Sequence, residues 1–244
     1  MSTTLIPPLS QPATRIGVSS TDLPRPAGRV HRQHEDDTPQ RLVIGNATWK
    51  EYLHLSEGVG ERRLRVTFDG KRVEIMAVSN MHEFWKTFLA MLMERLFVEM
   101  EINVHGYGNV TLRHNQAERA LEPDECYYVR RFEQVRDHIV DPDKDPTPDF
   151  VIEVEISRSV LDRLPIYAAL NVLEVWRYDG DKITVLLLNE QGQYDESANS
   201  GVLPTLPMAD FATFVAGMAS KGTLVVAREL RRWLRERGLV PAGN

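Results

Sequence analysis

Two acidic residues stand inside a segment that otherwise predicts a buried strand. Residues 147–157 read TPDFVIEVEIS, and the run from Phe150 to Ile156 is rich in β-branched apolar side chains. Such a run favours a strand that is covered on both faces. Glu153 and Glu155 are two positions apart, so in a strand their side chains point to the same face. Because like charges repel and burial of a carboxylate is costly, the position of this pair in a buried strand needs a physical explanation.

Other segments carry acids that could join this pair, namely Glu74, Glu83, Asp124 and Asp149. If predicted strands 124–131 and 149–156 are antiparallel neighbours, the start of one lies beside the end of the other. That arrangement brings Asp124 close to Glu153 and Glu155. Asp149 lies roughly 13 Å from Glu153 at the usual rise of a strand. Asp124 is therefore the better partner for a shared ion.

Clustered carboxylate oxygens are the ligands that a hard divalent cation requires. Mg²⁺ usually takes one or two carboxylates together with waters and substrate phosphate. Such an ion could lower the pKa of a bound water and clamp a scissile phosphate. It would also relieve the repulsion between Glu153 and Glu155. The spacing thus makes metal-dependent phosphodiester chemistry one candidate function.

Each of these residues also has a simpler structural interpretation. Glu83 could close a capping box with Asn80 at the start of a helix, and Glu155 could face solvent at a strand end. Asp124 and Asp149 both follow proline and could simply begin strands, and His82 could be an exposed or capping histidine. The arginine run ARELRRWLRER is typical of a solvated helix face. The residues alone leave these alternatives open.

The chain is long enough for one large domain with appendages, because it has 244 residues and 42% of them are hydrophobic. Residues 1–38 lack an apolar period and predict a flexible leader. We expect an α/β domain over 39–220, with a mixed β-sheet flanked by helices, and a basic C-terminal helix within 221–244. The strand over 149–156 should run parallel to a strand over 174–179, joined by a crossover helix.

Local patterns predict the elements that position the acids. Asp69-Gly70 and Asp179-Gly180 mark hairpin turns, and Asn171 is expected to take the left-handed conformation after a helix. Helices are predicted over 49–55, 81–100, 160–170, 207–218 and 222–237, and further strands over 101–105 and 109–113. Thr48 or Asn46 should cap the first helix.

Charge and cysteine content limit the possible partners and compartment. The net charge is −6, so a nucleic-acid partner requires a local basic patch or neutralising metal ions. The single cysteine, Cys126, excludes an internal disulfide and suits a reducing compartment. No apolar stretch approaches the length of a membrane span, and the N-terminus lacks a secretory pattern. We expect a cytoplasmic protein with no membrane partner.

Several blocks of the sequence resemble a known family. TLRHNQAERALEPDECYYV, PDFVIEVEISRSVLDRLPIYAALNVLEVWRYDG and ITVLLLNEQGQYDES are similar, in order and spacing, to the Uma-two-type endonuclease family. That family belongs to the PD-(D/E)XK, or restriction-endonuclease-like, superfamily. The resemblance covers about residues 43–218, and the LEPDECYYV and IYAALNVLEVWRYDG blocks are its most specific parts.

The resemblance implies a restriction-endonuclease-like core and a hydrolase that is a metal-dependent endonuclease. Asp124 corresponds to the aspartate of the PD element and Glu153 to the acid of the (D/E)XK element, and Glu83 stands where the family's first helix tends to place an acid. These three residues would hold Mg²⁺ or Mn²⁺ (magnesium or manganese), and a water bound to the ion would attack the phosphodiester. DNA is the expected nucleic-acid substrate.

The chain departs from the family pattern at the position of the lysine. The (D/E)XK lysine should fall at position 155, where this chain has Glu155. Some relatives carry a lysine in the following helix, and the matching residue here is Arg163. Arginine is always charged and cannot act as a general base, but it could stabilise a phosphorane-like transition state. Asp124, Glu153, Glu155 and Arg163 are therefore the candidate catalytic residues.

Two functions follow from these features. The first is the endonuclease, which the presence of Asp124 and Glu153 favours. The second is a catalytically degenerate nuclease fold that binds nucleic acid or a protein partner, which the missing lysine and the acidic charge favour. Some relatives pair into dimers, and an apolar edge around Tyr127, Val129 and Phe132 could support a homodimer; the sequence leaves the oligomeric state open. The sequence does not distinguish DNA from RNA or indicate sequence specificity.

Overall fold

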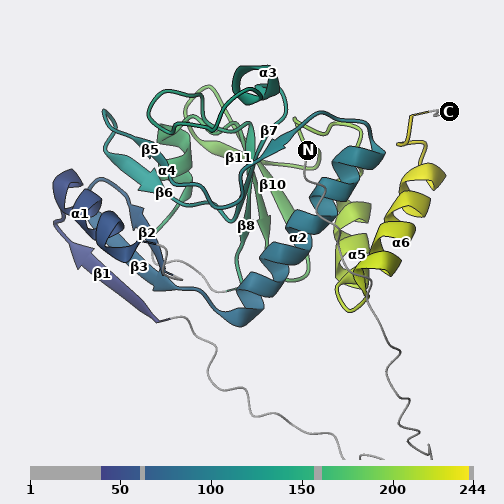
Figure 1. The fold of residues 1–244 in the computed structure, drawn as a ribbon, viewed down its shortest axis with the longest axis horizontal. Helices are drawn as coiled ribbons and strands as arrows, with labels where there is room; N and C mark the ends of the chain where they lie inside the picture. The colour runs from purple at the N-terminus through teal and green to yellow at the C-terminus, as the bar shows by residue number, and fades with distance from the viewer. Residues whose placement is uncertain (1–39, 61–63, 157–160, 242–244) are drawn as a thin grey trace, which may run out of the picture. The chain divides into compact units, whose positions relative to one another are not determined.

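The structure of the protein, a computed structural model, describes residues 40–60, 64–156 and 161–241. The predicted leader, the start of the helix predicted over 160–170 and the last three residues of the chain lie outside the described residues. The described strands fall into two sheets with orders β1-β3-β2-β6-β5 and β11-β10-β9-β8-β7-β4 (Figure 1). The fold is α/β with flanking helices, as expected, but it contains two sheets where a single one was predicted.

The smaller sheet is formed by the N-terminal part of the domain. Its strands are β1 (Arg41–Gly45), β2 (Leu64–Phe68), β3 (Arg72–Ala77), β5 (Leu112–His114) and β6 (Arg119–Leu121). The hairpin predicted at Asp69-Gly70 is confirmed, because β2 and β3 pair antiparallel and Gly70 has φ +88°. Helix α1 (Trp49–Val59) packs its Tyr52 against this sheet, and Thr48 caps the helix through a capping box with Glu51, as one of the two predicted caps.

The larger sheet contains the strand with the two glutamates. Its strands are β4 (His105–Gly106), β7 (Glu125–Tyr128), β8 (Phe150–Val154), β9 (Glu174–Tyr178), β10 (Ile183–Leu188) and β11 (Tyr194–Ser197). β7 and β8 pair antiparallel, and β8 and β9 pair parallel, with α4 (Leu164–Ala169) in the connection. Both pairings were predicted and are confirmed. Asn171 has φ 55° after α4, also as predicted.

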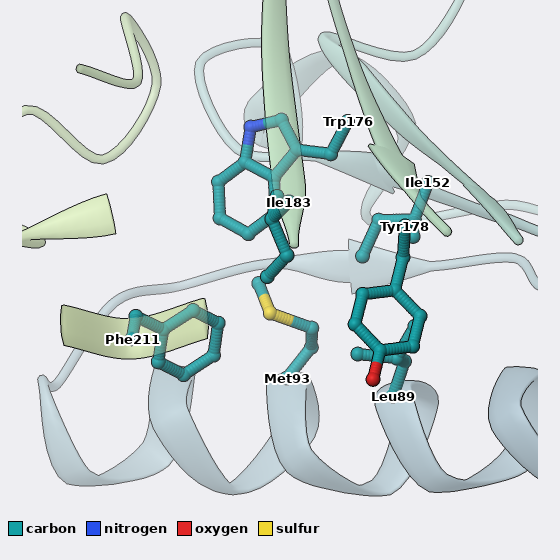
Figure 2. Close-up of a pocket in the computed structure, with 7 residues that line it drawn as sticks. All are labelled: Leu89, Met93, Ile152, Trp176, Tyr178, Ile183 and Phe211. Atoms are coloured by element: carbon teal, nitrogen blue, oxygen red, sulfur yellow. The ribbon is translucent and has the colours of Figure 1, made fainter. Parts of the chain in front are cut away.

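One face of the larger sheet is covered by three long helices. They are α2 (Asn80–Glu99), α5 (Met208–Met218) and α6 (Thr223–Glu236) (Figure 1). Figure 2 shows Leu89 and Met93 of α2 pointing from the helix towards Trp176 and Tyr178 of β9, with Phe211 of α5 beside them. These side chains leave no room for a water molecule. The part of this face shown in Figure 2 is therefore a closed core without space for a ligand.

The C-terminal helix α6 is amphipathic. Val226, Leu230 and Leu234 are fully buried in the core with α2, while Arg231 lies outside and pairs with Glu99 of α2 at 2.7 Å. The arginine run therefore follows the solvated face of the helix. Helix α6 therefore packs beside α2 and covers the apolar core with its buried face.

The other face of the larger sheet packs against α4 and the smaller sheet. Its apolar residues Cys126, Val151 and Val175 contact Tyr167 of α4 and Leu121 of β6. Because side chains alternate along a strand, Glu153 and Glu155 point to this same face. The candidate acids consequently lie between the sheet and α4.

Several local predictions need correction. Among the described residues, the strand predicted over 101–105 is reduced to His105–Gly106, which forms the edge strand β4. The short helix α3 (Phe132–Val135) follows β7 and was not predicted. Tyr127, proposed as part of a dimer edge, is 1% exposed and packs between Phe97 and Phe150, so it is not available to a partner.

Candidate functional site

The register of β7 and β8 brings Asp124 next to Glu153. Glu125 pairs with Ile152 in this antiparallel ladder, so the preceding residue, Asp124, lies opposite Glu153. Both side chains are buried, with Asp124 fully buried and Glu153 5% exposed. The backbone N–H of Val154 donates to Asp124 Oδ2 at 2.6 Å, which fixes the carboxylate against β8. The sequence predicted this proximity from the positions of the two strands.

Two cationic or polar side chains from distant segments hold Asp124. Arg65 of β2 forms an ion pair with Asp124 Oδ1, and His82 Nε2 lies 3.1 Å from Asp124 Oδ2. Burial alone would raise the pKa of Asp124, but the Arg65 cation and the His82 hydrogen bond outweigh it and hold the pKa below its usual value. Asp124 is therefore ionised at neutral pH.

Glu153 is held by two residues around α4. Arg163 Nη1 donates to Glu153 Oε2 at 2.9 Å, and the hydroxyl of Tyr167 donates to Glu153 Oε1. Burial raises the pKa of Glu153, the Arg163 cation lowers it and the charge of Asp124 raises it, and the net result is a pKa of about 7. Glu153 thus changes protonation state close to neutral pH.

Glu155 has a counterion of its own and does not add net negative charge to the site. Arg177 of β9 donates from Nε and Nη2 to the two oxygens of Glu155, both at 2.7 Å. This bidentate pair is partly exposed, with 37% of the Arg177 side chain and 31% of the Glu155 side chain accessible. The negative charges of the two glutamates are therefore compensated by two arginines, Arg163 for Glu153 and Arg177 for Glu155.

Glu83 lies apart from the two buried acids. Its side chain is 38% exposed and its Oε1 is 3.9 Å from His82 Nδ1, so His82 separates it from Asp124. The capping box predicted for Asn80 and Glu83 is wrong, because Ser79 is the N-cap and accepts from the backbone N–H of His82. The exposed or capping role predicted for the His82 side chain is also corrected, since it is 4% exposed and faces Asp124.

Asp149 has a structural role. Its Oδ2 accepts hydrogen bonds from the backbone N–H of Val129 at 2.7 Å and of Arg131 at 3.0 Å. These bonds anchor the chain where β7 ends and the turn into α3 begins. The preference for Asp124 over Asp149 as a site residue is consistent with this placement.

The carboxylates of the site meet the needs of a divalent cation only in part. Within the described residues, no three His, Cys, Asp or Glu side chains are grouped so as to hold one metal ion. Two carboxylates are nevertheless enough for Mg²⁺ when waters and substrate complete its shell. An ionised carboxylate has about four lone-pair positions. Asp124 uses three of these, for Arg65, His82 and Val154, and Glu153 uses two, for Arg163 and Tyr167.

Lone pairs therefore remain on both Asp124 and Glu153, and the residues fit a divalent ion in their donor chemistry. The two arginine charges act against a second cation, however, and favour weak binding. Arg65 and Arg163 would then serve as hydrogen-bond donors to the ligating carboxylates, a common arrangement around metal ions. Arg65, His82, Tyr167 and Arg177 were not predicted as site residues. A charged residue at an inward position of a strand, as at Arg65, is the signal that could have identified one of them.

Comparison with known proteins agrees with the resemblance seen in the sequence. A family model described as "Putative restriction endonuclease" matches residues 49–216. The match covers more than half of the chain, and the chain belongs to this family, Uma2. No curated protein matches the chain significantly.

Solved structures with a similar chain path include one from Anabaena variabilis, described as a "putative nuclease belonging to DUF820". It shares 14% sequence identity with this chain, and the similarity covers 77% of this chain and 99% of the other, with a TM-score of 0.46.

Proposed function

We propose that this chain is a metal-dependent endonuclease that hydrolyses phosphodiester bonds, with DNA as substrate and Mg²⁺ or Mn²⁺ as cofactor. The observation that carries the proposal is the side-by-side placement of two buried carboxylates, Asp124 and Glu153, on adjacent strands. Membership of the restriction endonuclease family supports the same reaction. The single buried thiol of Cys126 suits a cytoplasmic location.

In this proposal Asp124 and Glu153 hold the divalent ion. The chemistry that such an ion supplies when bound is a nucleophile at neutral pH and charge stabilisation on the phosphate. His82 and the backbone N–H of Val154 orient Asp124. Tyr167 and Arg163 orient Glu153 from its other side.

Arg163 has a second role in the proposal. It is always ionised, so it cannot accept the proton of the attacking water. Its Nη1 lies against Glu153, where negative charge develops on the phosphate during attack, and a fixed positive charge stabilises such a transition state. The presence of Glu155 at the position of the expected lysine therefore removes a general base there, while Arg163 supplies a cation for charge stabilisation.

A non-catalytic binding module is the second candidate, and one observation favours it. Each of the three acids Asp124, Glu153 and Glu155 contacts an arginine, respectively Arg65, Arg163 and Arg177. Their charge is therefore already compensated without a metal ion. A nuclease fold with such a site could bind nucleic acid or a protein without cleaving it.

Plasmid nicking with purified protein tests the two candidates. The wild type should nick supercoiled DNA with Mn²⁺ or Mg²⁺, lose this activity in EDTA, and lose it in Glu153→Gln. Glu190→Gln is the matched control, because Glu190 is an exposed residue in a loop away from the site and should cleave like the wild type. Cleavage that persists in EDTA and in Glu153→Gln would exclude this site as the catalytic centre. An inactive wild type combined with cleavage by Glu155→Lys would favour the binding module.

A further inference from the structure

Polar side chains form one row across four neighbouring strands of the larger sheet. Glu153 of β8 pairs in register with Arg177 of β9, and Arg177 pairs with Thr184 of β10. Asp124 lies opposite Glu153 on the other side. Adjacent strands are ~4.8 Å apart, so Arg177 stands one strand spacing from Glu153. The row therefore continues beyond the two buried acids towards β10.

An open pocket of about 670 Å³ lies at the Arg177 end of this row. It is lined by Glu155, Arg177, Asp179, Asp181, Lys182, Thr184, Leu186 and Glu196. Arg177 and Thr184 share the face of the sheet that carries Glu153. The pocket is thus next to the proposed catalytic acids and open to solvent.

The two arginines beside the glutamates differ in what they can bind. The Arg163 side chain is 13% exposed, and two of its nitrogens already donate, to Glu153 and to the carbonyl of Glu122. The Arg177 side chain is 37% exposed. Within the described residues, its guanidinium donates hydrogen bonds only to the carboxylate of Glu155. Arg177 is therefore the more accessible of the two arginines to a ligand.

A guanidinium forms the same paired hydrogen bonds with a carboxylate and with a phosphate. The bidentate Glu155 carboxylate thus occupies the position at which Arg177 would receive a phosphate. We propose that this pocket is the subsite for a backbone phosphate next to the scissile one, and that Arg177 anchors it. In the absence of nucleic acid, Glu155 occupies Arg177 and closes the subsite. This inference rests on the proposed function, because it places nucleic acid on this face of the sheet.

Spacing and charge set the expected strength of this contact. Arg177 is in register with Glu153 on the neighbouring strand, about 4.8 Å away along the sheet, so a phosphate on Arg177 would lie beside a phosphate bound to an ion that Asp124 and Glu153 hold. The remaining charges of the pocket are Asp179, Asp181 and Glu196 against Lys182, and this acidic excess repels phosphate. The wild type should therefore bind DNA weakly, and removing the charge of Glu155 should strengthen binding.

The test is the affinity for a short fluorescein-labelled DNA duplex, measured by fluorescence anisotropy in EDTA. Glu155→Gln should bind about tenfold more tightly than the wild type, the effect of one additional charged hydrogen-bonded contact. Its plot of log Kd against log salt concentration should be steeper by about 0.9, the value for one more phosphate contact. Adding Arg177→Gln to this variant should remove both gains. In the wild-type background, Arg177→Gln should change affinity little, because Glu155 already occupies Arg177.

Asp181→Asn provides the matched control, since it removes the same charge from the same pocket and Asp181 is not a partner of Arg177. Its gain should be clearly smaller than that of Glu155→Gln. An equal gain in Asp181→Asn, or a gain that persists without Arg177, would overturn the proposal and indicate a general charge effect. Because the assay contains EDTA and needs no cleavage, its outcome is independent of whether the wild type nicks DNA.

Discussion

Replacing Arg163 by methionine should make the stability of the protein depend on pH above neutrality. Arg163 is the counterion of Glu153, and the two side chains are 13% and 6% exposed. Removing one partner of a buried pair leaves an uncompensated charge. Glu153 should then stay protonated, and its pKa should rise well above the value of about 7 that it has beside Arg163.

The size of the effect follows from that pKa. Glu153 in the wild type titrates near pH 7 in the folded protein, against a value of 4.5 for an unperturbed glutamate. Stability therefore falls as the pH rises from about 4.5 to about 7 and then stays constant with respect to this group. In Arg163→Met the fall should continue above pH 7, by about 1.4 kcal/mol for each pH unit. Above pH 7, the difference in free energy of unfolding between the wild type and Arg163→Met should therefore grow by about 1.4 kcal/mol for each pH unit.

Urea unfolding of both proteins between about pH 6 and about pH 9 measures this difference. Arg177→Met serves as the control, because its pair with Glu155 is about one third exposed and such pairs contribute about 1 kcal/mol or less. Its difference from the wild type should be small and should not grow with pH. A constant difference between wild type and Arg163→Met across the range would refute the assignment of Arg163 as the counterion of a buried Glu153.

Three further predictions concern activity and the core. Leu230→Ala should lower the free energy of unfolding by about 2 to 5 kcal/mol, because Leu230 is fully buried between α6 and the core; an effect below about 1 kcal/mol in thermal or urea unfolding would contradict this packing. Metal-dependent nicking should increase as the pH rises through about 7, where Glu153 ionises; a rate that falls over this range would count against Glu153 as a ligand. Glu155→Lys should cleave faster than the wild type in the same assay, because it frees Arg177 and removes a negative charge; unchanged cleavage would show that Glu155 does not limit the reaction.

The elements with a strong local pattern could be predicted from the sequence. The apolar run before Glu153, the Asp-Gly turns and the helical period of α2 depend on neighbours in the chain, and each indicated the right element. The strands β5 and β6 have three residues each, which is too short for an alternating pattern to be distinctive. The division into two sheets depends on pairings between such short strands and was therefore missed.

The acids of the candidate site could be predicted from the sequence, but their counterions could not, for a related reason. The proximity of Asp124 and Glu153 follows from the antiparallel pairing of β7 and β8, which was predicted and which the structure contains. Their counterions come from other segments, Arg65 from β2 and Arg163 from the start of α4. Which basic residue meets which acid depends on packing between the two sheets and α4, and no spacing along the chain encodes it. The clustered carboxylates in the sequence consequently led to the prediction of a metal ion as their counterion. In the described residues, arginines are the counterions of these carboxylates.

The most direct test of the proposed site is a crystal of the protein soaked in MnCl₂ and measured at a wavelength where manganese scatters anomalously. The proposal predicts an anomalous peak in contact with carboxylate oxygens of Asp124 and Glu153, and no such peak in Asp124→Asn. A crystal in which Arg65 and Arg163 keep their contacts with these acids and manganese is absent from the site would contradict a metal-dependent nuclease centre at this position.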